Sequence, residues 1–414
     1  MKYNYNQLDL LFNEVGTPCY LVNEDLFLTN IRNIRDAFVS KYPNTIVGYS
    51  FKTNYLPYIC NLAKSEGCYA EVVSYLEYQI AKKVGFAPSN IIFNSPVKRK
   101  GEFFDALNSG ALINIDSEYE VLYLEEYHKQ NPEKDIKVGV RVNVAIKDEN
   151  GNSAIYGDEK IGRFGFIESE FKDIFARLSK INCSIVSLHG HTSSKNRAIS
   201  NYLQISDELL HIREEYDLDP DYIDIGGGFF GPVPKGMFSQ EPPKYLDYAD
   251  AIVEHLLQND WFRNKKPYLV IEPGMSVAAS SMTYVTRVYN IKERENRIVA
   301  QVDGNMFQIR QNLYQFKLPY YIVSKDSIMH KTNEQRIDFT GSTCMESDIM
   351  VRKNGFLDFS VGDYLLIDNV GAYTFVMGSN FIQFLPHIAV LKNNHFEVVR
   401  EGNNFNNFIE IYHW

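Results

Sequence analysis

Several residues suited to covalent and acid–base chemistry stand at the ends of short apolar runs. Lys52 follows IVGYSF, and Glu272 ends YLVIE just before a Pro-Gly pair. His189 and His191 lie in SIVSLHGH, and glycines fill positions 226–228. A lysine beside apolar residues loses hydration, which would lower its pKa and suit it to forming a Schiff base with an aldehyde. Consecutive glycines expose backbone N–H groups that suit a phosphate.

Each of these features also has an ordinary structural explanation. Lys52 is compatible with a solvated strand end, and the glycines with a tight turn. His189 and His191 are compatible with hydrogen-bonded core residues or, being two apart on one strand face, with a metal pair. Together, however, the set offers a lysine for an aldehyde, donors for a phosphate, a flat group for a ring and a carboxylate for a pyridine nitrogen. That combination predicts pyridoxal 5′-phosphate as the cofactor, without a metal.

Short strand-like runs carry these residues at their carboxyl ends and alternate with helical segments. The expected strands cover residues 46–52, 68–74, 91–96, 111–117, 135–144, 184–191, 222–228 and 268–274. Apolar residues spaced three and four apart predict helices over 75–85, 167–180 and 196–216. The alternation predicts an α/β fold, a (β/α)8 barrel over residues 24–280. In such barrels catalytic groups lie at the carboxyl ends of the strands, and phosphate often binds after strands seven and eight.

The pattern changes after residue 281. Closely spaced strand-like runs follow at 282–292, 297–304, 320–324, 363–373 and 395–402, with no helix of comparable length between them. This pattern of strand-like runs predicts an antiparallel β-domain over residues 281–414. We expect residues 1–23 to pack on that domain.

The composition excludes several classes of partner. The 414 residues carry 42 Lys+Arg against 52 Asp+Glu, a formal net charge of -10, which is the wrong sign for holding nucleic acid or an anionic membrane. No run is long and apolar enough to span a bilayer, and the polar start MKYNYNQ lacks the pattern of a signal peptide. The five cysteines are scattered without a CxxC pair, which predicts reduced thiols. We therefore expect a cytoplasmic protein that acts on a small molecule.

Six motifs make the chain resemble a known family. In chain order they are SFKTN, LHGHTSS, DIGGGFFG, IEPG, GSTCMESD and GAYT. With these motifs the chain resembles the pyridoxal-phosphate decarboxylases of the ornithine and diaminopimelate decarboxylase family, whose barrel is shared with alanine racemase. The likeness covers nearly the whole chain. It implies a carboxy-lyase that releases CO2 from an amino acid.

The resemblance implies a role for each matching residue. Lys52 would bind the cofactor aldehyde, His191 would stack on its ring, and Glu272 would hold its pyridinium. Arg141 aligns with an arginine that the family places near the cofactor. The residues implied to bind or flank the phosphate are Ser194, Gly228, Gly274 and Tyr373.

Other matches concern the substrate and a partner subunit. Arg310 and Tyr314, in IRQNLY, match residues that bind substrate in diaminopimelate decarboxylases, and Tyr373 is also implied to contact it. Cys344 would come from the partner subunit and protonate the carbanion, which implies a homodimer with shared active sites. A buried small hydrophobe is the plainer explanation of Cys344.

Two positions depart from the family pattern. Diaminopimelate decarboxylases read EPGR and CESGD, with the arginine and the glutamate contacting substrate, whereas this chain has Met275 and Met345. Ornithine decarboxylases carry an aspartate directly after the cysteine, so Met345 also argues against a simple diamine-forming enzyme. Glu346 is displaced by one position. We therefore expect an amino acid or amino-acid conjugate that is neither plain ornithine nor standard meso-diaminopimelate.

Alternative functions remain open at this point. One is a diaminopimelate decarboxylase with a modified site, and another is an amino-acid racemase on the same cofactor. Glu272 favours decarboxylation, because a carboxylate keeps the ring nitrogen protonated where the related racemase has an arginine. More distant alternatives are a metal-dependent barrel hydrolase using His189 and His191, and a non-catalytic protein that binds pyridoxal phosphate.

Overall fold

The computed structural model describes residues 3–157, 159–194, 196–234, 241–309, 318–325, 336–355 and 358–413. The chain divides into two compact units. One comprises Leu28–Pro232 and Gln240–Ser276, and the other comprises Met1–Phe27, Val233–Ser239 and Val277–Trp414. No helix within the described ranges is both long and apolar enough to cross a membrane.

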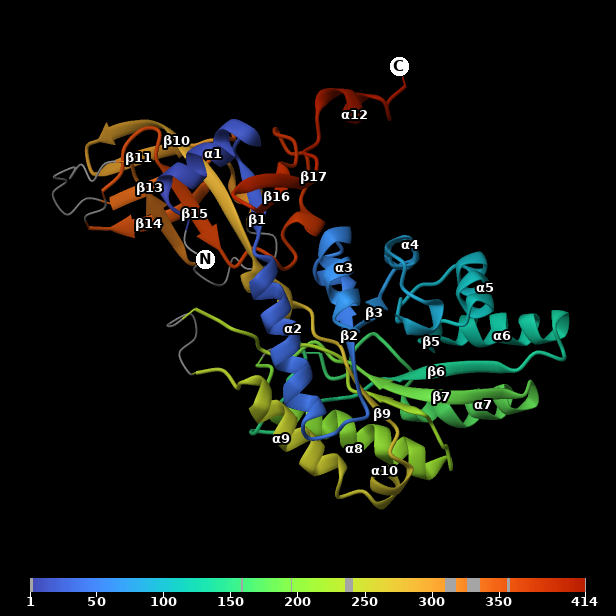
Figure 1. Ribbon diagram of the computed structural model, residues 1–414. Helices are drawn as coiled ribbons and strands as arrows, with labels where there is room; N and C mark the ends of the chain where they lie inside the picture. The colour runs from blue at the N-terminus through green and yellow to red at the C-terminus, as the bar shows by residue number, and fades with distance from the viewer. Residues whose placement is uncertain are drawn as a thin grey trace. The chain divides into compact units, whose positions relative to one another are not determined.

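The first unit is a closed barrel of parallel strands (Figure 1). In barrel order its strands are β2 (Thr45–Ser50), β3 (Tyr69–Val72), β4 (Ile91–Phe93), β5 (Leu112–Ile115), β6 (Ile136–Val142), β7 (Cys183–Gly190), β8 (Tyr222–Asp224) and β9 (Tyr268–Ile271), and β9 pairs back with β2. These strands are nearly continuous apolar runs because both of their faces are covered. Each expected strand overlaps one of them, so the predicted (β/α)8 barrel is confirmed.

Helices alternate with these strands along the chain. They are α2 (Glu24–Val39), α3 (Pro57–Ser65), α4 (Tyr75–Val84), α5 (Lys100–Ser109), α6 (Glu118–Gln130), α7 (Glu168–Lys180), α8 (Ile199–Glu215), α9 (Tyr245–Leu256) and α10 (Asp260–Lys265), with the short α11 (Met275–Ala278) after β9. Helix α7 buries Phe171, Ile174 and Leu178, spaced three and four apart, and packs against β7. The hydroxyl of Ser74 caps α4, and Gly85 ends it in the left-handed conformation. The three predicted helical segments correspond to α4, α7 and α8.

The second unit is a mixed sheet (Figure 1). Its described strands are β1 (Cys19–Val22), β10 (Met282–Arg294), β11 (Arg297–Val302), β12 (Tyr320–Val323), β13 (Arg336–Thr340), β14 (Ile349–Asn354), β15 (Tyr364–Asp368), β16 (His387–Lys392) and β17 (His395–Arg400). They run in the order β14-β13-β11-β10-β1-β16-β17, and β15 pairs with both β10 and β12. Most pairs are antiparallel, as predicted, but β1 runs parallel to β16 and β11 parallel to β13. The sequence reading missed β1, β13, β14 and β16.

The start of the chain contributes to the core of this second unit. Helix α1 (Tyr5–Glu14) begins with a capping box, in which Asn4 and Gln7 exchange side-chain and backbone hydrogen bonds. Its Leu8 and Leu11 are fully buried against Val285 of β10 and other apolar side chains. The short helix α12 (Phe405–Ile409) follows β17 near the end of the chain.

Candidate active site

The barrel strands end at one rim, and the predicted residues of this unit stand there. Lys52 lies in the 3-10 turn η1 (Phe51–Thr53), directly after β2. Arg141 and His189 lie in the last residues of β6 and β7, and Glu272 directly follows β9. Because the carboxyl ends of parallel strands share one edge of a barrel, closure brings these side chains together.

Lys52 is paired with a buried carboxylate. Its Nζ lies 2.8 Å from Oε2 of Glu71, which is on the neighbouring strand β3. The Ser50 hydroxyl donates to the same oxygen at 2.5 Å, and Asn94 Nδ2 lies 3.3 Å from Oε1 of Glu71. The Glu71 side chain is 1% exposed and that of Lys52 is 30% exposed, so the amine faces the open side of the rim. A carboxylate there can receive or return a proton of the lysine amine.

Glu272 is a buried carboxylate that remains ionised. Asn94 Nδ2 donates to its Oε1 at 2.6 Å, and His189 Nε2 lies 3.7 Å from its Oε2. Burial alone would raise the pKa of Glu272, but the opposing effects of His189 and Lys52 hold that pKa below its ordinary value. Burial, reinforced by the Glu272 charge, raises the pKa of the neighbouring Asp224 well above its ordinary value. The two neighbouring carboxyl groups are therefore shifted in opposite directions, which favours the negative charge on Glu272 over Asp224.

His191 is a neutral imidazole with a fixed tautomer. Burial, followed by the positive charge of Lys52, lowers the pKa of His191 to about 3. Its Nδ1 accepts a hydrogen bond from the Gly227 amide at 3.1 Å, so the ring proton is on Nε2. The His189 and His191 rings are nearly parallel, with centroids 6.5 Å apart. His191 thus offers a flat, uncharged face at the rim.

The glycine loop and the segment after β9 lie so close to their neighbours that side chains do not fit. A Cβ atom at Gly227 would lie 2.1 Å from the backbone oxygen of Glu272, and one at Gly274 would lie 2.1 Å from Oγ1 of Thr53. Gly228 has a φ of +100°, which L side chains rarely adopt. The loops after β8 and β9 therefore present backbone amides rather than side chains, as a phosphate site requires.

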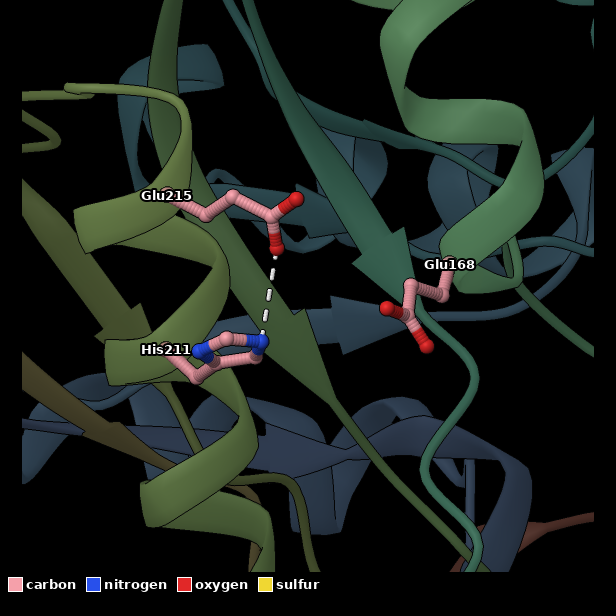
Figure 2. A group of neighbouring side chains, drawn as sticks. All are labelled: Glu168, His211 and Glu215. Carbon is pink, nitrogen blue, oxygen red and sulfur yellow. Dashed lines mark ion pairs between the residues drawn. The ribbon is translucent and has the colours of Figure 1, made fainter.

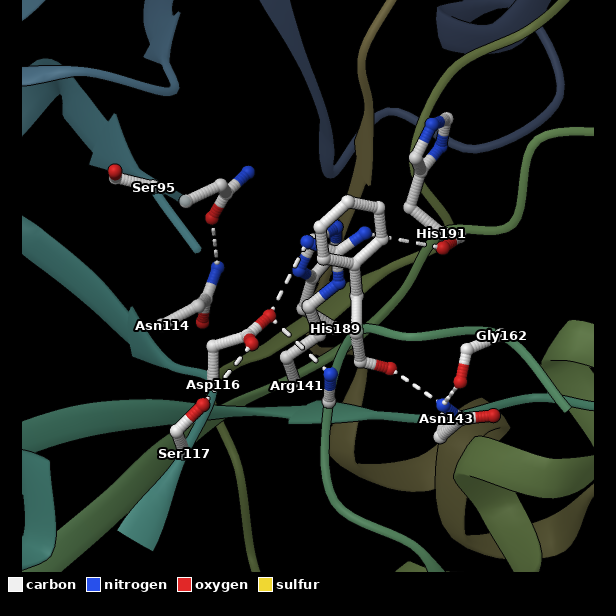
Figure 3. A network of polar contacts seen from close by, with 12 residues as sticks. Ser95, Asn114, Asp116, Ser117, Arg141, Asn143, Gly162, His189 and His191 are labelled. Atoms are coloured by element: carbon white, nitrogen blue, oxygen red, sulfur yellow. Dashed lines mark hydrogen bonds and ion pairs between the residues drawn. The ribbon is translucent and has the colours of Figure 1, made fainter. Parts of the chain in front are cut away.

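Arg141 is held by an acidic partner and supports the His191 segment (Figure 3). Its Nη1 lies 3.3 Å from Oδ1 of Asp116, and its Nη2 donates to the backbone oxygen of His191 at 3.2 Å. The guanidinium also lies 4.6 Å from the centre of the Phe164 ring. The geometry gives Arg141 a part in positioning the segment that carries His191 and Ser194.

Ser194 is tied to the long segment between β6 and α7. An isolated antiparallel bridge joins Ile155 to Ser194, and the Tyr156 amide donates to the Ser193 oxygen at 2.9 Å. The Ser194 hydroxyl accepts from the Arg197 amide at 3.1 Å. A hydroxyl that accepts one hydrogen bond can still donate its own proton, as a phosphate ligand must.

Cys344 lies in the second unit, in the turn between β13 and β14. It is exposed, whereas Cys19, Cys60, Cys68 and Cys183 are buried. The buried Asp348 organises this turn, since its carboxylate accepts from the amides of Met306 and Thr343 and from the Thr343 hydroxyl. The plainer explanation of Cys344 as a buried hydrophobe is therefore wrong. The aspartate of the GSTCMESD motif fixes the turn that displays the thiol.

Three other predicted residues lie outside the barrel, and the structure describes one of them, Tyr373. Tyr373 has a φ of +56°, a left-handed conformation that is costly for a residue with a side chain. The amide of nearby Gly371 donates to the Ala279 oxygen at 2.9 Å, which anchors this loop in the second unit. Arg310 and Tyr314 lie outside the described residues.

Two groups of metal-ligating side chains occur in the described ranges. Glu168, His211 and Glu215 form an exposed group, with His211 Nε2 3.3 Å from Oε2 of Glu215 (Figure 2). The other group is the buried set already described, His189 with Asp224 and Glu272. Neither includes His191, whose Nδ1 is engaged by the glycine loop. Within the described ranges, His191 thus belongs to no group of three or more metal-ligating side chains.

Three further members of this site contact Lys52 or Glu272 or lie beside them: Glu71, Asn94 and Asp224. The position of Glu71 near the end of the second expected strand places it at the rim, but the sequence assigns it no role. Sequence reasoning missed Asn94 and Asp224, although both stand at or near the carboxyl end of an expected strand, where the same rule applies.

The assembled groups fit pyridoxal phosphate. The barrel rim offers an amine, an ionised carboxylate, a flat neutral ring and glycine-containing loops with no room for a Cβ at Gly227 or Gly274. These are the groups that its aldehyde, ring nitrogen, ring face and phosphate require.

Comparisons with known proteins agree with this geometry. The family model described as "Pyridoxal-dependent decarboxylase, pyridoxal binding domain" matches residues 28–279. The chain is 26% identical to the diaminopimelate decarboxylase of Methanothermobacter thermautotrophicus, over 96% of this chain and 92% of that protein. It is 27% identical to that of Aquifex aeolicus, over 95% of this chain and 91% of the relative. The crystal structure of diaminopimelate decarboxylase from M. jannaschii has a TM-score of 0.82 and 25% identity, covering 97% of this chain and 93% of that one.

Proposed function

The chain belongs to the pyridoxal-dependent decarboxylases, and we propose that it decarboxylates an amino acid or amino-acid conjugate that is neither plain ornithine nor standard meso-diaminopimelate. The observation that carries the reaction type is the buried Glu272 carboxylate, which stays ionised at the same rim as Lys52. The relatives named diaminopimelate decarboxylase support an amino acid as the substrate.

The residues of the rim have separable tasks. Bound pyridoxal phosphate supplies a sink for the electron pair left behind when CO2 departs. Lys52 would provide the amine that binds the cofactor aldehyde, and Oε2 of Glu71, 2.8 Å from that amine, would accept a proton from it. Glu272 keeps a proton on the ring nitrogen, because a nearby carboxylate favours the cationic form. Neutral His191 covers a ring face without opposing that charge.

The charge of Glu272 also separates decarboxylation from racemisation. A protonated ring nitrogen draws electrons strongly, which suits loss of CO2. The racemase that shares this barrel carries an arginine at this place, which leaves the nitrogen unprotonated. The hydrogen bond from Asn94 and the neighbouring His189 both stabilise the ionised form of Glu272.

The substrate assignment rests on two methionines. Met275 stands where diaminopimelate decarboxylases carry a substrate-contacting arginine, and its sulfur lies 3.8 Å from Nη2 of Arg197. Met345 stands beside Cys344, where those enzymes carry a substrate-contacting glutamate, and it is 41% exposed. Neither thioether replaces a charge-assisted hydrogen bond. A substrate whose far end differs from that of meso-diaminopimelate fits these changes, and a diaminopimelate decarboxylase with a modified site is the alternative.

We also propose a homodimer in which Cys344 protonates the carbon in the partner's site. The thiol is exposed in a turn that Asp348 holds, and this exposure supports the proposal. This arrangement makes the site dependent on two chains, as isologous dimers allow. Tyr373, Arg310 and Tyr314 keep their proposed roles toward phosphate and substrate.

The test begins with the visible spectrum of the purified protein before and after borohydride, followed by peptide mapping. We expect a reduced cofactor on Lys52. CO2 release is then measured with lysine, ornithine, arginine, meso-diaminopimelate and amino-acid conjugates. Efficient turnover of ornithine or meso-diaminopimelate would overturn the substrate proposal, and absence of a chromophore after adding pyridoxal phosphate would overturn the reaction.

A further inference from the structure

The guanidinium of Arg197 lies where three loops of the barrel rim meet. Arg197 is in the loop after β7, the sixth barrel strand. Its guanidinium lies 5.3 Å from the centre of the Phe230 ring, in the loop after the seventh strand. Its Nη2 lies 3.8 Å from Sδ of Met275, in the segment after the eighth strand.

The backbone of Arg197 is held in an unusual conformation. Its φ is +50°, in the left-handed region that costs energy for a residue with a Cβ. The Arg197 amide donates to Oγ of Ser194 at 3.1 Å, and its carbonyl accepts from the Tyr248 hydroxyl at 2.7 Å. That hydroxyl also accepts from the Phe230 amide at 3.4 Å. Tyr248 thus fixes Arg197 to the glycine loop, and strain maintained by such contacts is typical of ligand sites.

The position is suited to a phosphate. Barrels of this class often bind phosphate in the loops after strands seven and eight, and the Arg197 side chain contacts both. The glycine loop provides amide dipoles, whereas a phosphate dianion is bound more tightly when a full positive charge is also present. An arginine can donate two parallel hydrogen bonds to phosphate oxygens, which fixes orientation as well as charge.

We propose that Arg197 is the cationic ligand of the cofactor phosphate in this protein. This inference rests on the proposed function. It adds to that function a phosphate ligand that no motif of the sequence indicated. The residue after Glu272-Pro-Gly is Met275 rather than an arginine. A guanidinium nevertheless reaches this part of the rim from a different loop, and Met275 packs against it.

The test measures cofactor binding rather than turnover. Protein freed of cofactor with hydroxylamine is titrated with pyridoxal phosphate and, separately, with pyridoxal, which lacks the phosphate. We expect Arg197→Ala to weaken binding of pyridoxal phosphate by roughly tenfold to a hundredfold, with binding of pyridoxal unchanged. Arg197→Lys keeps the positive charge but cannot donate two parallel hydrogen bonds. Its affinity for pyridoxal phosphate should therefore lie between those of wild type and Arg197→Ala. Arg263→Ala, at an exposed arginine that pairs with Asp260, is the matched control.

Each other outcome has a definite meaning. Equal losses for pyridoxal phosphate and pyridoxal would show a structural role and overturn the proposal, as would unchanged affinity for both. A raised KM for substrate with unchanged cofactor affinity would assign Arg197 to a substrate carboxylate instead. Circular dichroism checks folding, and Arg197→Lys decides the question if Arg197→Ala does not fold. A wild-type protein that binds neither compound would overturn the proposed function together with this inference. If the wild type binds pyridoxal phosphate tightly and the Arg197 variants do so equally well, only the inference about Arg197 is overturned.

Discussion

Asn94 joins two carboxylates of the site, because its Nδ2 lies 2.6 Å from Glu272 Oε1 and 3.3 Å from Glu71 Oε1. Its own Oδ1 accepts from Asn114 Nδ2 at 2.8 Å, which orients the amide. One neutral side chain therefore links the carboxylate beside the lysine to the carboxylate proposed for the ring nitrogen.

Replacing Asn94 should separate cofactor capture from catalysis. We expect Asn94→Ala to retain borohydride-trapped cofactor but to lower kcat by about tenfold or more, since a hydrogen bond to a buried charge is lost. Steady-state kinetics and the absorbance of the bound cofactor measure the two effects. Asn131→Ala, near the end of α6, is a control that should leave both unchanged. An unchanged kcat in Asn94→Ala would remove this residue from the mechanism.

Substitution of Lys52 should abolish cofactor labelling, whereas substitution of Glu71 should change the pH profile of kcat. Lys52→Ala removes the amine, so no peptide should carry reduced cofactor after borohydride. Glu71→Gln keeps the amine but removes the carboxylate 2.8 Å away, so labelling should persist while the pH profile of kcat changes. Mass spectrometry of peptides gives the first result and a pH series the second. Lys100→Ala, at an exposed lysine paired with Glu126, should match wild type in both.

The shared-site proposal can be tested by mixing two defective proteins. Lys52→Ala and Cys344→Ala should each have low activity alone, the second with its cofactor retained. After subunits exchange, random pairing of one chain of each kind leaves one intact site in half of the dimers, so about a quarter of wild-type activity should return. Sedimentation checks that the proteins are dimers. If activity stays at the level of the separate proteins, Cys344 does not act across a subunit boundary.

Glu77 should make stability depend on pH. Burial raises the pKa of Glu77 from 4.5 to about 7, although its Oε2 accepts from the Val73 amide at 2.8 Å. The folded state therefore binds a proton more tightly than the unfolded state, so stability falls as pH rises from about 4.5 through 7, by at most about 3 kcal/mol. Urea unfolding across this range measures the slope. We expect Glu77→Gln to flatten it, and an identical slope in the variant would assign the dependence to other groups.

The sequence allowed the barrel to be predicted because its strands are mostly apolar and its helices keep their periodicity, as in Phe171, Ile174 and Leu178 of α7. The missed strands could not be recognised from such a pattern. β14 mixes apolar and charged residues over IMVRKN, whereas the apolar β1 stands before the alternation of barrel strands and helices and pairs with the distant β10 and β16. The parallel pairing of β11 with β13 depends on contacts between distant segments, which no local pattern reports.

The same distinction applies to the site. Lys52 and Glu272 were found because their chemistry is unusual where strands end. Asn94 and Asp224 were missed because a polar residue after a strand usually marks a turn, and only the closed barrel shows that both are buried beside Glu272. Arg197 had no signal at all, since its importance depends on contacts with Phe230 and Met275 from two other loops.

The barrel closes where its first strand meets its last, and this seam has a consequence for synthesis of the chain. Val47 of β2 pairs with Ile271 of β9, and the Ser50 amide donates to the Pro273 oxygen at 3.1 Å. Lys52 and Glu272 are 220 positions apart and become neighbours only after this seam forms. A growing chain that has not yet delivered β9 has an amine but no matching carboxylate, so tight cofactor capture is restricted to finished barrels. A ligand that binds only the folded state stabilises it. Binding of the vitamin-derived cofactor would therefore favour completed chains over incomplete ones.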